Sequence, residues 1–140
     1  MTTTGAEVRG GPAAGVTAGR ILLVLGGVLI ILGLALPEFP GSSFIMCNDE
    51  TPICVATTLE HGSPLIPVII ALAAIGRRPS APDYARGLTL AAGIGALLIF
   101  GAHLAYALFR SDTPVGPAVY AGLAAGVVLL VGAWRLRGPA

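Results

Sequence analysis

Four long apolar runs, separated by short linkers, constrain the fold of this chain more than any other feature. They cover residues 21–36, 64–76, 87–109 and 115–134. Hydrocarbon offers no hydrogen-bond partner to a peptide group, so apolar runs of this length cross a bilayer as α-helices. The sequence therefore predicts an all-α integral membrane protein, built as a bundle of four transmembrane helices.

The arginines are distributed unevenly over the linkers. If all four runs cross, Arg110 lies on one side and the other seven of the eight arginines lie opposite, at positions 9, 20, 77, 78, 86, 135 and 137. Arginine beside a span stays on the cytoplasmic side, which predicts that both termini are cytoplasmic. If 64–76 does not cross, the better of the two orientations leaves five arginines on the cytoplasmic side and three on the other. The split of seven to one with four spans follows the rule more closely, so the arginine count favours four spans.

The second run is short, because 13 residues give only about 20 Å of helix against a hydrocarbon core of roughly 30 Å. Two arrangements would let it cross. Ser63 caps a helix that begins at Pro64, or the helix begins near Thr58 and kinks at Pro64. Both arrangements place Glu60 and His61 near the outer surface.

The predicted domain organisation is simple. Residues 1–20 form a disordered cytoplasmic tail because they lack apolar periodicity. The membrane domain covers 21–137, with spans at about 21–36, 60–76, 87–109 and 115–134. Residues 138–140 form a short C-terminal tail on the cytoplasmic side. A cleaved signal peptide is a competing interpretation of the first run, since Gly33 and Ala35 are small, but the run and its leading segment are long for one.

Composition narrows the class of protein. Hydrophobic residues make up 55% of the chain and charged residues 11%, far fewer than the quarter or so of soluble proteins. A net charge of +1 without a broad basic surface argues against nucleic-acid binding. Every basic residue is arginine, a bias typical of GC-rich bacterial genomes, so we expect a bacterial plasma membrane protein, with the lipid bilayer around it and no cofactor.

The outer loop, residues 37–63, holds the only two cysteines, Cys47 and Cys54. An even number of cysteines on the oxidising side of the membrane predicts a disulfide that staples this loop. Thiol–disulfide catalysis is disfavoured, because the spacing is not Cys-x-x-Cys and Asp49 and Glu50 would raise a thiol pKa. A metal site drawing on both cysteines, Asp49 and His61 is a further alternative, although no ligand spacing fixes it.

His103 is the one ionisable residue inside the third run, and Tyr106 follows it on the same helix face. Such a residue is a candidate proton relay, ligand contact or haem ligand. We expect a neutral imidazole hydrogen-bonded across helices, because no acidic partner lies at membrane depth. A haem held by two histidines is disfavoured, since the other histidine, His61, is predicted near the surface.

Small residues recur at four-residue intervals and mark candidate packing faces. They are Ala118, Gly122 and Gly126 in the last run, with Ala91 and Gly95 in the third. Small side chains let helix backbones approach closely, which is the main source of helix association in lipid. The sequence leaves open whether these faces pack inside the bundle or against another protein.

Three classes of function remain open. A non-enzymatic accessory, assembly or structural subunit of a membrane complex is favoured, because packing residues dominate and clusters of catalytic residues are missing from the sequence. A small oligomeric transporter or channel is weakened by the lack of a carboxylate in any run. An enzyme at the outer face would use Glu60, His61 and the cysteine loop.

Overall fold

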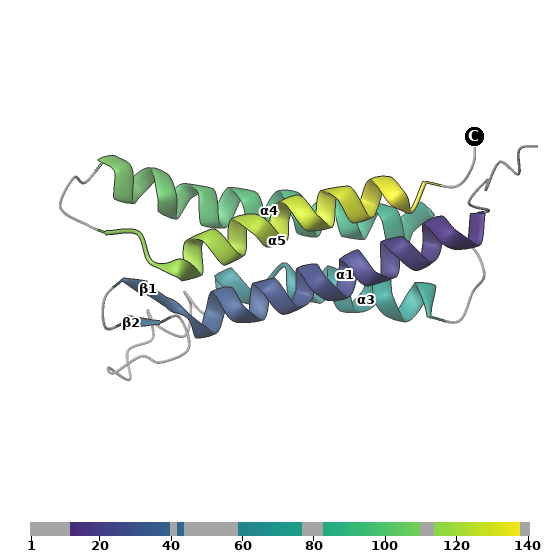
Figure 1. Cartoon of the computed structure of the whole chain (residues 1–140), viewed down its shortest axis with the longest axis horizontal. Helices are drawn as coiled ribbons and strands as arrows, with labels where there is room; N and C mark the ends of the chain where they lie inside the picture. Colours follow the sequence, from purple (N-terminus) through teal and green to yellow (C-terminus); the bar gives the residue numbers. More distant parts are fainter. Residues whose placement is uncertain (1–11, 40–41, 44–58, 77–82, 110–113, 138–140) are drawn as a thin grey trace, which may run out of the picture.

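The computed structural model describes residues 12–39, 42–43, 59–76, 83–109 and 114–137. The described part is built almost entirely from α-helix, as predicted. Its elements are α1 (Pro12–Ala35), β1 (Pro37–Phe39), β2 (Ser42–Ser43), α3 (Leu65–Ile75), α4 (Asp83–Phe109) and α5 (Pro117–Arg135), with a helical turn at 59–62 before α3 (Figure 1).

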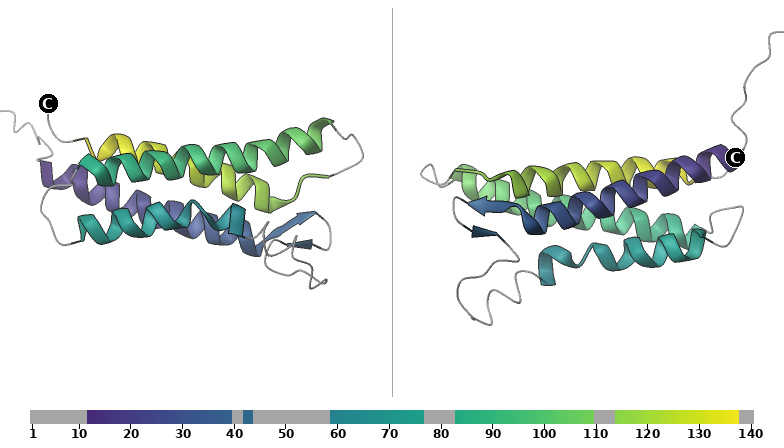
Figure 2. Two further views of the ribbon diagram at one scale, coloured as in Figure 1. Left: turned by 180° about the vertical axis from the view of Figure 1, so that it is seen from behind. Right: turned by 60° about the horizontal axis from the view of Figure 1, so that its bottom comes forward.

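The helices lie side by side in a bundle, arranged as a ring (Figures 1 and 2). α1 packs against α5, α5 against α4, and α4 against α3, while α3 completes the ring with fewer contacts to α1. Consecutive helices run in opposite directions, so α1 and α4 begin at the end where α3 and α5 finish. At the other end β1 and β2 pair antiparallel, with Pro37 opposite Ser43.

Three helices are long and apolar enough to cross a membrane, namely Ala14–Ala35, Asp83–Phe109 and Pro117–Arg135. The segment Leu59–Ile75 is a shorter apolar helix. Large apolar side chains also cover the outside of the bundle, as at Leu98, which is 69% exposed, and Phe109, which is 91% exposed. A soluble monomer rarely exposes such surface, so the described part of the chain has the character of a membrane protein.

α1 begins earlier than the sequence indicates. The prediction of a disordered tail up to residue 20 is wrong for residues 12–20, which continue the helix from Pro12. Proline suits a first helical position. Glycines in this extension pack closely on the end of α5: a Cβ at Gly15 would lie 3.2 Å from the carbonyl oxygen of Arg135, and Gly19 faces the side chain of Leu136. Packing of this kind stabilises a stretch whose own sequence has no apolar stripe.

The helix is interrupted at Ser63 and Pro64, before α3. The Ser63 hydroxyl donates a hydrogen bond to the Glu60 carbonyl oxygen at 2.8 Å, and no side chain caps α3. The alternative in which Ser63 caps a helix that begins at Pro64 is therefore wrong. The helical turn at 59–62 agrees with the other alternative, a helix that begins earlier and breaks at the proline.

Small residues close the interior of the bundle. Ala118, Gly122 and Gly126 all lie on the buried face of α5. The Phe100 ring of α4 occupies the space where Gly122 would carry a side chain. A Cβ on Gly126 would lie 3.1 Å from the carbonyl oxygen of Gly93, and one on Gly93 would lie equally close to that of Gly126. The α5 face is thus used inside the bundle.

Two of the predicted packing residues of α4 lie elsewhere. Ala91 is exposed, and Gly95 is half-buried, with only Pro64 near the place where its Cβ would be. Gly93, between them, makes the contact with α5. A further line of small residues, not predicted from the sequence, lies on α1: Gly19, Gly26 and Gly33 recur every seven residues and face α5. The seven-residue spacing of these glycines is the sequence pattern that indicates this packing face.

Candidate functional site

The only two histidines of the chain come together inside one end of the bundle. Nε2 of His61, in the turn before α3, lies 3.1 Å from Nδ1 of His103 on α4. His61 is 0% exposed and meets His103 directly, so the expectation that the two histidines lie at different depths in the membrane is wrong. The contact joins residues 42 positions apart in sequence and agrees with the expectation that His103 bonds across helices.

The buried face of α3 explains the position of His61. Val68, Ala71 and Ile75 form that face, and His61 precedes Val68 by seven residues, about two helical turns. His61 therefore continues the same face despite the break at Pro64. Around it, the Phe100 ring meets the imidazole edge-on, with centroids 5.3 Å apart, and the His103 ring does so at 4.4 Å.

The contact between the imidazoles requires one proton between the two facing nitrogens. Nδ1 of His103 also lies 3.1 Å from the carbonyl oxygen of Ile99, one turn earlier on α4. A carbonyl only accepts, so a proton on Nδ1 can be donated to Ile99 and shared with Nε2 of His61. In the other tautomer, His61 donates to His103. The pair can thus hold or pass a proton, or present two nitrogen ligands.

A hollow of about 300 Å³ lies beside His103, lined by Ala102, His103 and Tyr106. Tyr106 is 51% exposed and follows His103 by nearly one turn, as the sequence spacing predicts. The hollow has room for water or a small ligand next to the histidine pair. Direct contact between the two imidazoles leaves no space for a macrocycle between them, which argues against the two-histidine haem.

Other predicted site residues do not join the pair. Glu60 is exposed while His61 is buried, so these neighbours point apart and cannot act together as an acid and a base. Cys47, Cys54 and Asp49 lie outside the described residues. The predicted disulfide and the alternative metal site on the cysteines therefore stay predictions.

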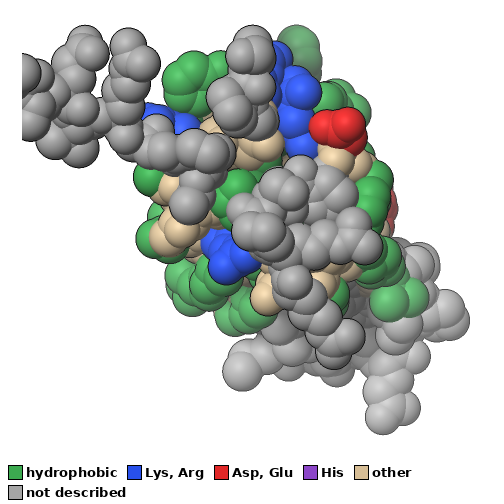
Figure 3. Space-filling view, turned by 90° about the vertical axis from the view of Figure 1, so that its right-hand side faces the viewer, with side chains coloured by type: hydrophobic (Ala, Val, Ile, Leu, Met, Phe, Trp, Pro, Cys, Tyr) green, Lys and Arg blue, Asp and Glu red, His purple; other side chains and the backbone are tan. Residues whose placement is uncertain are grey.

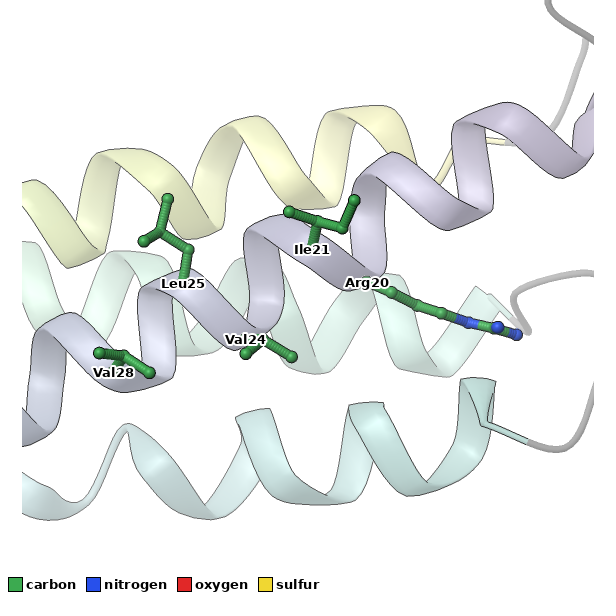
Figure 4. Close-up of a pocket in the computed structure, with 5 residues that line it drawn as sticks. All are labelled: Arg20, Ile21, Val24, Leu25 and Val28. Carbon is green, nitrogen blue, oxygen red and sulfur yellow. The ribbon is translucent and has the colours of Figure 1, made fainter.

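A second hollow, of about 430 Å³, lies along the outside of α1 (Figure 4). Ile21, Val24, Leu25 and Val28 line it, and Arg20 lies at its end. The Arg20 guanidinium donates a 2.7 Å hydrogen bond to the carbonyl oxygen of Ile75, at the end of α3. This cation therefore stabilises a helix C-terminus, and the rest of the lining is apolar, so the hollow offers less chemistry than the histidine pair.

Basic side chains are visible at the end of the bundle where α1 and α4 begin (Figure 3). Arg135 lies in the last turn of α5 there, and its guanidinium carbon is 5.1 Å from the centroid of the Trp134 indole ring. The histidine pair lies toward the opposite end. Comparison with known proteins adds no assignment, because no family model matches the chain and no curated protein matches its sequence.

Proposed function

We propose that this chain is a multi-pass protein of the bacterial plasma membrane in which Leu59–Ile75 crosses as a fourth span and both termini are cytoplasmic. The fourth segment runs beside α1 and α4 along much of the bundle (Figure 2), which supports a crossing. Its 17 residues give about 25 Å of helix, close to the hydrocarbon thickness when the bilayer thins locally. The arginine distribution supports the orientation.

The proposed role is that of a non-enzymatic accessory, assembly or structural subunit of a membrane complex. One observation carries it: the interior of the described bundle is filled by helix packing, while every helix presents large apolar side chains outward. Buried Thr89 bonds the Ala85 carbonyl of its own helix. Thr89 therefore adds no polar contact between helices, and the histidine pair is the main polar contact between helices inside the described bundle. The outer surface suits contact with lipid or other apolar helices.

The two other classes of function have less support. A transport path through one copy would meet the Phe100 ring seated on Gly122, so a transporter would need several copies to enclose its path. An outer-face enzyme built on Glu60 and His61 would need side chains that face each other, and these two do not.

Purification of the tagged full chain from its native membrane in a mild detergent tests the proposal. We expect native mass spectrometry to find a stoichiometric complex with another membrane protein, or with further copies, instead of a single 14.0 kDa chain. A single chain that retains its fold and carries only detergent and lipid would contradict the proposal.

Outward-facing substitutions sharpen this test. One exposed side chain on each helix can be changed to tryptophan: Leu25 on α1, Ile69 on α3, Leu98 on α4 and Val127 on α5. A bulky ring is tolerated in lipid but obstructs a closely packed helix partner. We expect one of the four variants to lose its partner, and the other three serve as matched controls for bulk and hydrophobicity.

A further inference from the structure

We propose that His61 and His103 bind a divalent transition-metal ion, with Nε2 of His61 and Nδ1 of His103 as its protein ligands. The remaining ligands are water or a small anion from the hollow beside His103 and Tyr106. This site goes beyond the proposed subunit role and does not depend on any partner protein.

The distance between the two nitrogens fits such an ion. Bonds from zinc or similar ions to imidazole nitrogen measure about 2.0–2.1 Å. Two bonds of that length whose nitrogens are 3.1 Å apart meet at an angle of about 98°, between the octahedral and tetrahedral values. The rings cross at 71°. Binding therefore requires the rings to rotate until both lone pairs point at one ion.

The proton between the histidines can be displaced by the ion. A ligating imidazole nitrogen must be unprotonated, so binding moves the His103 proton to Nε2 or releases it. Nδ1 then gives up its contact with the Ile99 carbonyl oxygen. That oxygen keeps its place in α4 as the helical acceptor of the His103 backbone amide. Metal binding should therefore weaken as the pH falls.

The two imidazole ligands determine which metal ions the site favours and how many coordination positions remain for exchangeable ligands. Among the described residues, no group of three or more His, Cys, Asp and Glu side chains gathers, so the histidines are the protein's two ligands there. Imidazole suits zinc, copper, nickel and iron, and copper(II) binds most strongly of the divalent ions in this series. The hollow of about 300 Å³ admits the exchangeable ligands.

Electron paramagnetic resonance of the full chain in detergent with one equivalent of Cu²⁺ tests the site. We expect hyperfine coupling to two imidazole nitrogens. His61→Gln and His103→Gln keep a hydrogen-bonding side chain but lose a ligand, so each should show one histidine nitrogen and bind Cu²⁺ at least ~10-fold more weakly, since even loss of an outer-shell partner costs that much. The double variant measures background binding, and Tyr106→Phe, the matched control, should keep both nitrogens.

A second measurement needs no substitution. The chain contains two histidines in all, so labelling histidine with ¹⁵N marks both proposed ligands. We expect the label to change the splitting of bound Cu²⁺ from the ¹⁴N to the ¹⁵N pattern, and Zn²⁺ to compete for the site. An unchanged pattern, a spectrum shared with the double variant, or no stoichiometric binding would overturn the proposal and leave a hydrogen-bonded pair.

Discussion

At Gly122 the missing side chain is what allows α4 and α5 to approach. The Phe100 ring, which is fully buried, fills the space above the glycine and also meets the edge of His61. One aromatic side chain thus connects the small-residue face of α5 with the candidate site. Interiors packed to this density respond to a single methyl group.

Gly122→Ala should destabilise the protein by about 1–3 kcal/mol, because the new methyl group overlaps a rigid aromatic ring. Thermal unfolding in detergent measures the change. Gly101→Ala is the matched control, since a Cβ there would meet only Leu123, at 4.0 Å. We expect the control to be neutral or slightly stabilising. Equal effects of the two substitutions would contradict the described packing.

Arg20, in the first half of α1, is joined to the end of α3 by its hydrogen bond to the Ile75 carbonyl oxygen. Arg20→Ala should destabilise this end of α3 by about 1 kcal/mol, because the terminal carbonyl of Ile75 loses the hydrogen bond from a charged donor. Faster hydrogen exchange of the amides near Ile75 would report the loss. Arg135→Ala removes the same charge at the same end without touching α3, and it should leave that exchange unchanged.

At the scale of elements, the length of the apolar runs predicted four helices but not which face of each helix is buried. A helix that is apolar all round gives no signal for which face is buried, so His61 could not be assigned to the interior from sequence. Its contact with His103 depends on tertiary packing across the break at Pro64. The four-residue spacing on α5 was sufficient for Ala118, Gly122 and Gly126, whereas on α4 it selected Ala91 and Gly95 in place of Gly93.

The extension of α1 was hidden for a different reason. Residues 12–20 include two glycines, which weaken a helix, and they have no apolar stripe of their own, so the stabilising contacts come from α5. Hydrogen exchange in detergent discriminates helix from tail. We expect the amides of residues 16–20 to be protected nearly as well as the middle of α1, because packed helical amides open rarely. Complete exchange within seconds would instead support the disordered tail.

At the scale of the whole molecule, the arginine count and the antiparallel order of the helices favour the same topology by independent arguments. The count depends on charges in linkers, whereas the order depends on how apolar segments pack. Chain segments joined by short connections pack as antiparallel neighbours, and that is the arrangement of α3, α4 and α5. The short segment Leu59–Ile75 is the element on which the number of crossings depends.

Single cysteines placed at three exposed positions test those crossings, in a background with Cys47→Ser and Cys54→Ser. The substitutions are Glu60→Cys before the short segment, Asp83→Cys at the start of α4 and Pro114→Cys before α5. With four crossings, a membrane-impermeant maleimide added to intact cells should label positions 60 and 114 and spare position 83, since lipid separates them. Permeabilised cells should label all three. If the segment enters and leaves on one side of the membrane, positions 60 and 83 would give the same labelling result in intact cells. That outcome would contradict the four-span topology.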